Sequence, residues 1–292
     1  MKPYTVVDAF SALPFQGNPV GVVLDAAGLT DTTMQAMARW TNLSETTFVL
    51  PPRHEQADYR LRIFTPRSEL PFAGHPTLGT AHALVEAGLI KPESGKIIQE
   101  CQQGLINITV EGPVDSQIYT LELPRPSSTT LTSHERMELE AILGAPILPN
   151  PLPARLDVGA VWAVAQVADV AALLNMQPDF QRMQLFAQQL GLTGVSVFAN
   201  HGSNSANVEV RSFAPSCGVV EDPVCGSGNG CVAAFRFQHG LVPANHYEAT
   251  QGQKLGRSGR LFLHMTPSGA IRLGGHCTTS LKGHLAMPSN LA

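Results

Sequence analysis

The chain has 292 residues, of which 43% are hydrophobic and 14% are charged, and its formal net charge is −4 at pH 7. This length is enough for two domains with sizeable cores. The weakly acidic balance lacks the basic surface that nucleic acids require, so we expect no nucleic-acid partner.

No segment of the sequence indicates export or membrane insertion. The N-terminus lacks a signal-peptide core because Asp8 interrupts the apolar run early. The longest apolar stretch, residues 158–174, contains Gln166 and Asp169 and is too short to span a bilayer. The 5 cysteines form no C-x-x-C pair, which argues against a disulfide framework and against a zinc site. We therefore expect a cytoplasmic protein with free thiols, no membrane partner and no bound metal.

The first half of the chain alternates predicted strands and helices. Residues 29–33 supply a helix cap and an early acidic residue, so a helix is expected from there to Trp40. A second helix is expected within residues 73–89. Segments rich in β-branched and apolar residues predict strands at 5–10, 20–24, 42–50, 60–64, 96–100, 106–110 and 118–123.

The clearest change of composition is the Pro- and Ser-rich segment 124–130, which we interpret as the domain boundary. Residues 1–127 form the predicted N-terminal half, and a last strand near 283–292 is a candidate to pack against it. Residues 128–292 form the predicted C-terminal half. The elements expected there are helices at 132–143, 169–174, 180–190 and 225–241, and strands at 158–167, 195–198, 208–213, 261–265 and 270–273.

One stretch of the sequence occurs twice. Residues 73–89 and 225–241 both begin with a small residue and Gly, continue through small and apolar residues, and end in Gly-Leu, each position recurring 152 residues later. A helix that is apolar nearly all round belongs inside a domain. Upstream, the segment 62–66 is matched by 211–215, at an offset of 149 residues. The sequence therefore predicts an α+β protein with two similar halves, each with strands around one buried helix.

The N-termini of the two repeated helices suggest a binding function. Each would present free backbone N–H groups, next to Gly74 in one copy and to Gly226 and Gly228 in the other, and such groups attract anions. A small carboxylate is the ligand that this arrangement favours. The run 226–230 lacks the Gly-Lys-Ser/Thr ending of a phosphate loop, so nucleotide binding is not expected.

Acidic and imidazole side chains near these helices are the candidates for chemistry. Glu45 falls on Gly194 at the 149-residue offset and has no twin, which makes it the natural proton carrier, although by itself it is equally a solvated surface residue. His75 opens the first helix, where it could donate to a substrate or cap the helix. Asp222 precedes the second helix and could cap it, orient His75 or bind substrate, whereas Glu221 is expected to be exposed.

Cys225 lies at the mouth of the second helix. The helix dipole there would lower the pKa of its thiol, and the alternative interpretation is a small buried side chain.

Several motifs together resemble the PhzF-like phenazine-biosynthesis family along nearly the whole chain. They are Gly17-Asn18-Pro19, Asn42-Leu43-Ser44-Glu45-Thr46, Phe64-Thr65-Pro66, Glu69-Leu70-Pro71-Phe72-Ala73-Gly74-His75-Pro76, Gly218-Val219-Val220-Glu221-Asp222-Pro223 and Gln251-Gly252. The resemblance implies the diaminopimelate epimerase-like fold, with two pseudo-symmetric domains, each a β-barrel-like sheet wrapped around a central buried helix, and an active site between them. It also implies a homodimer.

By the same resemblance, Glu45 matches the family's acid/base glutamate, and His75 and Asp222 match its two assisting side chains. The positions that bind the substrate are matched by Gly74, Gly226 and Ser227, with Asn18 and Cys225 as further candidates. The best-known family activity is the isomerisation of trans-2,3-dihydro-3-hydroxyanthranilate without cofactor or metal.

The chain departs from that member in the second repeated helix. Cys225 replaces a threonine, and Gly228-Asn229 replace a pair of alanines. These differences leave the substrate open more than the proton chemistry.

We therefore expect a cofactor-independent isomerase that moves a proton on a small cyclic carboxylate. Related racemases use two thiols, one from each half, but Ala73 stands at the first of these positions here, so that chemistry cannot run. One base, Glu45, would take and return the proton. The alternatives are a one-thiol epimerase that uses Cys225 and a non-catalytic protein that binds small carboxylates.

Overall fold

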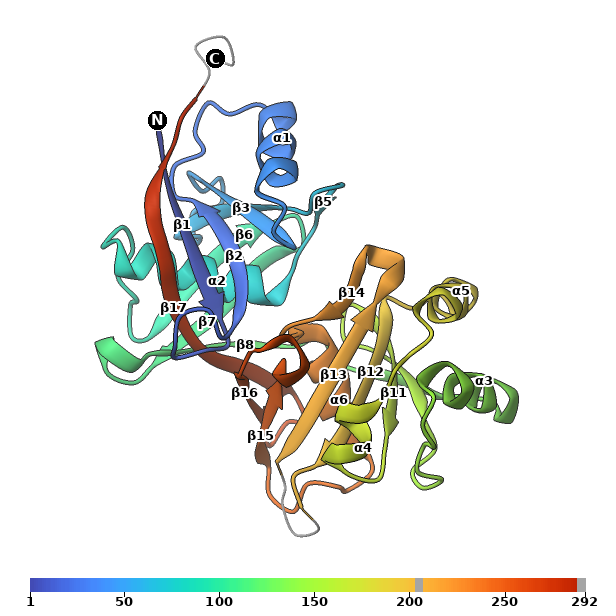
Figure 1. The fold of residues 1–292 in the computed structure, drawn as a ribbon. Helices are drawn as coiled ribbons and strands as arrows, with labels where there is room; N and C mark the ends of the chain where they lie inside the picture. The colour runs from blue at the N-terminus through green and yellow to red at the C-terminus, as the bar shows by residue number, and fades with distance from the viewer. Residues whose placement is uncertain (203–206, 288–292) are drawn as a thin grey trace. The chain divides into compact units, whose positions relative to one another are not determined.

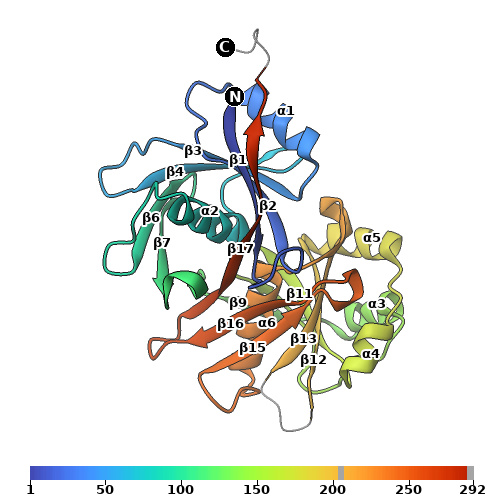
Figure 2. The ribbon, with the colours of Figure 1, turned by 60° about the vertical axis from the view of Figure 1, so that its left-hand side comes forward.

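The computed structural model describes residues 1–202 and 207–287 of the chain. They divide into two compact units, one formed by Met1–Leu121 together with the segment from Gly274 onward, the other by Glu122–Leu273. We call them unit 1 and unit 2. Figures 1 and 2 show the strands and helices of each unit from two directions.

Unit 1 is a sheet closed on itself. Its elements are β1 (Lys2–Ala9), β2 (Asn18–Val23), α1 (Asp31–Thr41), β3 (Glu45–Leu50), β4 (Tyr59–Phe64), β5 (Glu69–Leu70), α2 (Gly74–Glu86), β6 (Lys96–Cys101), β7 (Gly104–Glu111), most of β8 (Ile118–Glu122) and the greater part of β17 (Ile271–Leu285). The strands pair in the order β17, β1, β2, β3, β4, β6, β7 and β8. Because β8 also pairs with β17, the sheet closes into a barrel, which leaves no long edge unpaired.

Helix α2 lies within this barrel and packs against β1, β2 and β3 (Figure 2). Its side chains from His75 to Ala81 are all buried, which is why an almost wholly apolar sequence is stable there. Gly79 permits a close approach, since a Cβ at this position would lie 2.5 Å from Val20 Cγ1. Gly88, with φ +69°, follows the helix in the left-handed conformation expected from the sequence.

Helix α1 covers the outside of the same sheet. Thr30 caps its N-terminus by accepting a hydrogen bond from the Thr33 N–H, and Asn42 ends it with φ +54°. Met34 and Ala38 pack on Phe48 and neighbouring side chains in a second, smaller core. The chain therefore leaves α1 at a fixed point and enters β3 directly at Glu45.

Unit 2 repeats the strand pairing of unit 1. Its elements are β9 (Ser127–Thr130), α3 (Ser133–Leu143), β10 (Ala154–Asp157), β11 (Val161–Gln166), α4 (Val170–Asn175), α5 (Phe180–Leu190), β12 (Gly194–Asn200), β13 (Val208–Ala214), β14 (Val219–Asp222), α6 (Gly226–Gln238), β15 (His246–Gln251) and β16 (Gly259–Met265). From β10 to β16 the neighbours pair antiparallel, parallel, antiparallel, parallel and antiparallel, in the same succession as from β1 to β7. The duplication predicted from the sequence is thus present in the topology.

The helices of unit 2 pack on both faces of its sheet. Helix α6 is buried from Gly228 to Arg236 and contacts β10, β11, β12 and β16. Helices α3, α4 and α5 cover the other face and share a large apolar core with β11, β12 and β13. The fold is mixed α+β, as the sequence predicts.

The boundaries of the units differ from the predicted ones at two points. The chain leaves unit 1 after Leu121, before the predicted boundary at 127, and Ser127–Thr130 form a strand that pairs with Ala154–Asp157 in unit 2. It returns to unit 1 at Gly274 and not near 283, because β17 extends to Leu285 and pairs with β1 from Cys277 onward. The end of the predicted last strand, 288–292, lies outside the described residues.

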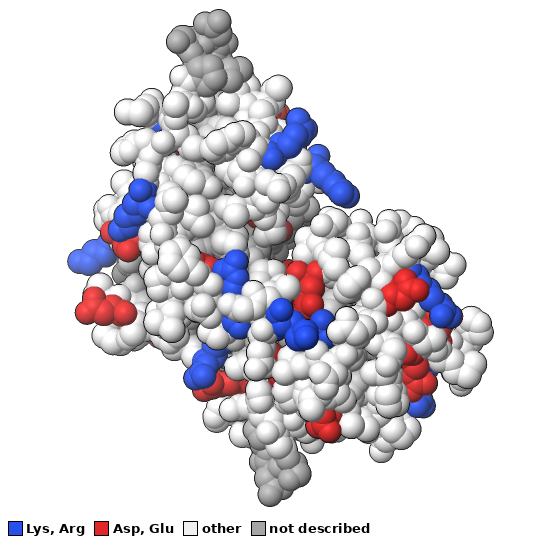
Figure 3. All heavy atoms as spheres, viewed as in Figure 1, with Lys and Arg blue, Asp and Glu red and all other residues white. Residues whose placement is uncertain are grey.

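The surface carries few charges. On the face shown in Figure 3, the Lys, Arg, Asp and Glu side chains are scattered and intermixed among uncharged residues. None of the helices in residues 1–202 and 207–287 has the length and apolar character that a membrane span requires.

Candidate active site

Glu45 is the first residue of β3, where the chain enters the barrel of unit 1. In the parallel ladder it lies opposite Val20 of β2. Its side chain is 16% exposed, so the solvated surface position that the sequence left open does not apply. The carboxylate is therefore largely buried but keeps some contact with solvent.

His75 is the second residue of α2 and reaches toward Glu45. Its Nε2 lies 3.3 Å from Oε2 of Glu45, and its side chain is 8% exposed. Ala73, the N-cap residue of α2, provides no side-chain cap, and His75 does not act as one either. Within the described residues, neither Glu45 Oε2 nor His75 Nε2 has a hydrogen-bond partner, and their contact is a close approach without hydrogen-bond geometry. The two side chains form a buried titratable pair with unused hydrogen-bonding capacity.

The charge state of His75 follows from its surroundings. Burial lowers its pKa below the ordinary value, because the charged imidazolium loses its hydration, and the neighbouring Glu45 carboxylate opposes this effect only in part. Near neutral pH the ring is therefore neutral. A neutral imidazole can donate from one nitrogen and accept at the other, so it can orient Glu45 or pass a proton without adding a fixed charge.

Two more polar side chains of unit 1 that lie in the family-like motifs are Asn18 and Ser44. Asn18 is 1% exposed and opens β2, opposite Ala9 of β1. Ser44 precedes Glu45, and its buried hydroxyl has no hydrogen-bond partner within the described residues. Ser44 was not among the predicted site residues. The signal that could have identified it is its place directly before Glu45 in the segment 42–46, which resembles the family. Gly74 is the first residue of α2, and a Cβ there would make only ordinary contact, 4.0 Å from Leu121 Cδ2.

In unit 2 the N-terminus of α6 is closed by Cys225. The Cys225 Sγ accepts a hydrogen bond of 3.3 Å from the Gly228 N–H, and Gly226 is the first helical residue. Burial, followed by the charge of Asp222, raises the pKa of the Cys225 thiol well above its ordinary value. The predicted lowering of this pKa by the helix dipole is wrong, because desolvation of the thiolate outweighs the dipole. The interpretation as a small buried side chain holds.

Ser227 occupies the position of α6 that His75 occupies in α2. Its Oγ accepts a hydrogen bond of 3.1 Å from Nε1 of Trp162 on β11. Gly194, the first residue of β12, is the counterpart of Glu45 and cannot carry a side chain, since a Cβ there would lie 2.1 Å from the Phe213 carbonyl oxygen and 2.7 Å from the Trp162 ring. The contact between Trp162 and Ser227 was not predicted.

Asp222 ends β14, three residues before the N-cap of α6. Its carboxylate accepts a hydrogen bond of 3.0 Å from the Val224 N–H, and its carbonyl accepts one of 2.8 Å from Gln251. Asp222 therefore stiffens the approach to α6, whose N-cap residue is Cys225.

Glu221 is not exposed, which corrects the prediction. It forms a two-pronged ion pair with Arg211, at 2.9 Å for both contacts, and its side chain is 10% exposed. The adjacent residues Glu221 and Asp222 thus make different contacts. Glu221 links β14 to β13 through its ion pair with Arg211.

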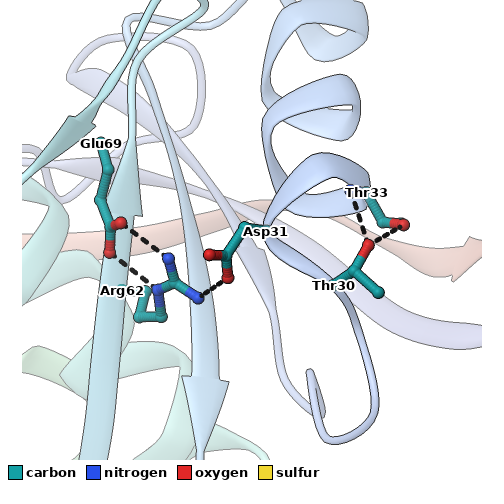
Figure 4. Close-up of polar contacts among 5 residues, drawn as sticks. All are labelled: Thr30, Asp31, Thr33, Arg62 and Glu69. Atoms are coloured by element: carbon teal, nitrogen blue, oxygen red, sulfur yellow. Dashed lines mark hydrogen bonds and ion pairs between the residues drawn. The ribbon is translucent and has the colours of Figure 1, made fainter.

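Unit 1 also has an open surface hollow of about 420 Å³ between α1 and β4, lined by Asp31, Gln35, Arg39, Arg62 and Glu69 among others. Arg62 pairs with both oxygens of Glu69 and with Asp31, which raises the pKa of its guanidinium (Figure 4). Because these carboxylates already neutralise Arg62, the hollow is a poor anion site. Glu45 and His75 do not line it.

No set of three or more His, Cys, Asp or Glu side chains in residues 1–202 and 207–287 gathers as a metal site would require. The cysteines in these ranges are unpaired, as their spacing predicts.

Comparison with known proteins assigns the chain to a family. The family model described as phenazine biosynthesis-like protein matches residues 7–283. The chain is 40% identical to antisense-enhancing sequence 1 of Schizosaccharomyces pombe, covering 95% of this chain and 96% of that protein. It is 34% identical to the trans-2,3-dihydro-3-hydroxyanthranilate isomerase of Pseudomonas aeruginosa, covering 97% and 99%. The protein belongs to the phenazine biosynthesis-like (PhzF) family.

Solved structures place the fold in a wider group. A PhzF-family protein of Bacillus anthracis superposes with a TM-score of 0.87 at 24% identity, covering 98% of this chain and 99% of that one. A probable proline racemase of Agrobacterium radiobacter superposes with a TM-score of 0.67 at 12% identity, covering 99% and 94%. At these identities the likeness shows the fold, which is shared with racemases and epimerases.

Proposed function

We propose that the protein is a cofactor-independent isomerase that moves a proton between two carbon atoms of a small cyclic carboxylate. The observation that carries this proposal is the buried pair of Glu45 and His75, whose facing atoms lie 3.3 Å apart and have no hydrogen-bond partner within the described residues. A buried pair of this kind is costly to maintain for stability alone.

Glu45 acts as the general acid and base. As a carboxylate it removes a proton from an activated C–H, and the electron pair left behind spreads into the conjugated system of the substrate. The resulting carboxylic acid then delivers the proton to another carbon of that system, which restores the carboxylate. A positioned general acid/base contributes about 10²–10⁴ in rate.

His75 assists Glu45 in its neutral form. The ring can hold the glutamate in one orientation, or donate to the substrate where negative charge develops, and a neutral donor does so without stabilising the ground-state carboxylate of Glu45 too strongly. Burial lowers the pKa of His75, so this form persists across the neutral range.

Binding of the substrate carboxylate is assigned in this proposal, on the family resemblance alone, to the positions of Gly74, Gly226 and Ser227. A helix N-terminus contributes about 0.3–1 kcal/mol to an exposed anion and up to about 2 kcal/mol in a partly buried site. Asp222 is proposed as a second assisting side chain, on the family resemblance of its motif.

The names of the relatives support an isomerase. One at 34% identity is a trans-2,3-dihydro-3-hydroxyanthranilate isomerase, and one of Deinococcus radiodurans at 30% identity is called an uncharacterized isomerase. The alternative of a one-thiol epimerase is disfavoured, because the Cys225 thiol is buried and its pKa is raised.

Proton exchange in heavy water tests the proposal. The protein is incubated with trans-2,3-dihydro-3-hydroxyanthranilate in D₂O, and deuterium incorporation is followed by NMR and mass spectrometry. We expect incorporation at the carbon that receives the proton, and a loss of about 10²–10⁴ in rate for Glu45→Gln. Glu86→Gln on α2 is the matched control, since Glu86 contacts Thr279 and Lys282 and not His75. Unchanged exchange in Glu45→Gln would refute the proposal.

Cys225→Ala separates the remaining alternatives. An isomerase that relies on Glu45 keeps its turnover in this variant, whereas a one-thiol epimerase loses it. A protein that binds the carboxylate without any exchange, in all variants, would be a binding protein.

A further inference from the structure

The residue that holds Ser227 in place is Trp162. Its indole is 2% exposed, and Nε1 lies 3.1 Å from Ser227 Oγ. An indole N–H can only donate, so Ser227 Oγ is the acceptor in this hydrogen bond. A buried tryptophan normally satisfies its N–H, but here the partner is a side chain at the N-terminus of the repeated helix.

The space for this indole is explained by comparing one pair of opposite residues in each unit. Where unit 1 has a smaller residue opposite a larger one, unit 2 has the larger residue on the other strand. In unit 1 a small apolar residue, Val20, lies opposite Glu45 in the parallel ladder. In unit 2 the corresponding ladder places Trp162 opposite Gly194, and the ring lies so close to Gly194 that a Cβ there would be 2.7 Å from it. The indole therefore occupies the place that an acidic side chain has in unit 1, and it reaches Ser227 as Glu45 reaches His75.

The hydrogen bond from Trp162 limits the directions in which the Ser227 O–H can point. A serine hydroxyl has two acceptor positions and one proton to donate. Trp162 fills one acceptor position, and the Cys225 Sγ lies 3.8 Å from the same oxygen. Either of these two atoms could be the donor, and the Asp222 carboxylate competes for the Cys225 S–H, since after burial its contact with the thiol helps to raise the thiol pKa. Because the indole N–H occupies one acceptor position, the Ser227 O–H points away from the ring, where the Cys225 sulfur or an incoming ligand can accept its proton.

We propose that Trp162 is a positioning residue that holds the Ser227 hydroxyl as a donor to the carboxylate group of the substrate. This inference rests on the proposed function, since it assigns the ligand of Ser227 from that function. A carboxylate is an acceptor only, and a pre-oriented O–H together with the N–H groups of α6 matches it. The orienting residue acts on binding and not on proton transfer.

Binding of 3-hydroxyanthranilate, a stable aromatic counterpart of the proposed substrate, tests this inference by calorimetry. We expect Kd to rise about fivefold for Trp162→Phe, which keeps the ring and removes the N–H, and about tenfold for Ser227→Ala. The double variant should bind no more weakly than Ser227→Ala alone, because the indole acts through the hydroxyl. The neutral amide 2-amino-3-hydroxybenzamide, whose carbonyl oxygen accepts a hydrogen bond without charge assistance, should show a smaller loss in each variant.

Trp40→Phe is the matched control, because the sequence has 2 tryptophans and Trp40 is 77% exposed on α1. It should leave Kd unchanged. In turnover of trans-2,3-dihydro-3-hydroxyanthranilate, Trp162→Phe should raise KM by a similar factor and change kcat by less than about twofold. Equal loss in kcat, additive losses in the double variant or an unchanged Kd would each overturn the inference.

The two indole N–H signals in a ¹H–¹⁵N spectrum provide a measurement that does not depend on a folded Trp162 variant. Ser227→Ala should shift the Trp162 signal and leave the Trp40 signal in place, and 3-hydroxyanthranilate should shift the Trp162 signal in the wild type. No shift with either would refute the inference. Should binding depend on Trp162 while heavy-water exchange is absent, the proposed isomerase would fail and the positioning role would stand.

Discussion

The two units share a scaffold down to individual polar contacts. In each unit two strands precede the repeated helix, a longer one and then a short one, and a two-pronged ion pair joins them. The pair is Arg62–Glu69 between β4 and β5 in unit 1, and Arg211–Glu221 between β13 and β14 in unit 2. Each has a glutamine after that helix, Gln99 or Gln251, which hydrogen-bonds to a polar side chain of the helix. These contacts explain why the two halves of the sequence share the arginine, the glutamate and the glutamine at corresponding places.

The units differ where the chemistry is proposed. Glu45 and His75 of unit 1 correspond to Gly194 and Ser227 of unit 2, so a titratable pair in one is replaced by a hydrogen bond from Trp162 in the other. The comparison teaches that a duplicated frame can hold a buried titratable pair in one unit and a hydrogen-bonded indole in the other.

The largest difference in stability should come from the two ion pairs. The side chains of Arg211 and Glu221 are 5% and 10% exposed, and Arg211 also donates to the carbonyls of Leu173 and Met176. Glu221→Gln leaves a buried guanidinium without its counter-charge and should cost about 3–5 kcal/mol. Glu69→Gln should cost about 1 kcal/mol or less, because Arg62 is partly exposed and keeps Asp31.

Hydrogen exchange resolved by unit measures this difference, since a chain of two units need not unfold in one step. Destabilisation should be confined to the unit that carries the change. Equal destabilisation by Glu221→Gln and Glu69→Gln would contradict the expected difference between the two ion pairs.

The second difference concerns the two glutamines. Gln251 makes three hydrogen bonds, with the Cys225 N–H, the Asn229 amide and the Asp222 carbonyl. Gln99 makes two, with the Tyr59 hydroxyl and with Thr77. Gln251→Leu should therefore destabilise by about 2–3 kcal/mol and Gln99→Leu by about 1–2 kcal/mol, each loss leaving buried partners unsatisfied. Urea unfolding monitored in each unit measures these two losses of stability. A larger loss for Gln99→Leu than for Gln251→Leu would contradict the expectation.

The smallest difference is in the response to pH. Burial lowers the pKa of His75 and of His82 in α2, whose counterparts in α6 are Ser227 and Ala234. Both histidines bind protons more readily in the unfolded chain, so their contribution to stability is present above pH 6.5 and is lost as the pH falls below that value. Each can add at most about 1.4 kcal/mol per pH unit.

Unit 1 should thus lose protection from hydrogen exchange between pH 7 and pH 5 more steeply than unit 2. His82→Gln, which lies outside the proposed site and retains a donor for Thr279, should reduce that slope. An unchanged slope would show that His82 does not contribute.

Much of the frame could be predicted from the sequence because its signals are local. The capping box of Thr132 and Glu135, the positive φ of Gly88 and Gly240, and the apolar helices α2 and α6 all follow from neighbouring residues. Strand β9 could not be predicted, since Ser127–Thr130 are polar and exposed and are defined by their pairing with β10.

The site was only partly predictable for the same reason. Glu45 could be singled out because the repeat leaves it without a twin, but its distance from His75 depends on the register of β3 beside α2. The contact of Trp162 with Ser227 joins residues 65 positions apart, and the pKa of Cys225 depends on how completely tertiary packing buries it. Neither leaves a mark in the local sequence.

A label-transfer experiment tests the central claim, that one glutamate both takes and returns the proton. Substrate deuterated at the carbon that loses its proton is converted by wild-type protein in ordinary water, in a single turnover, and the product is analysed by mass spectrometry. The carboxylic acid of Glu45 holds the proton it has removed and exchanges it only in part with solvent before the return step, so part of the deuterium should appear at the receiving carbon. Complete loss of the label at every pH tested, with turnover intact, would contradict the account.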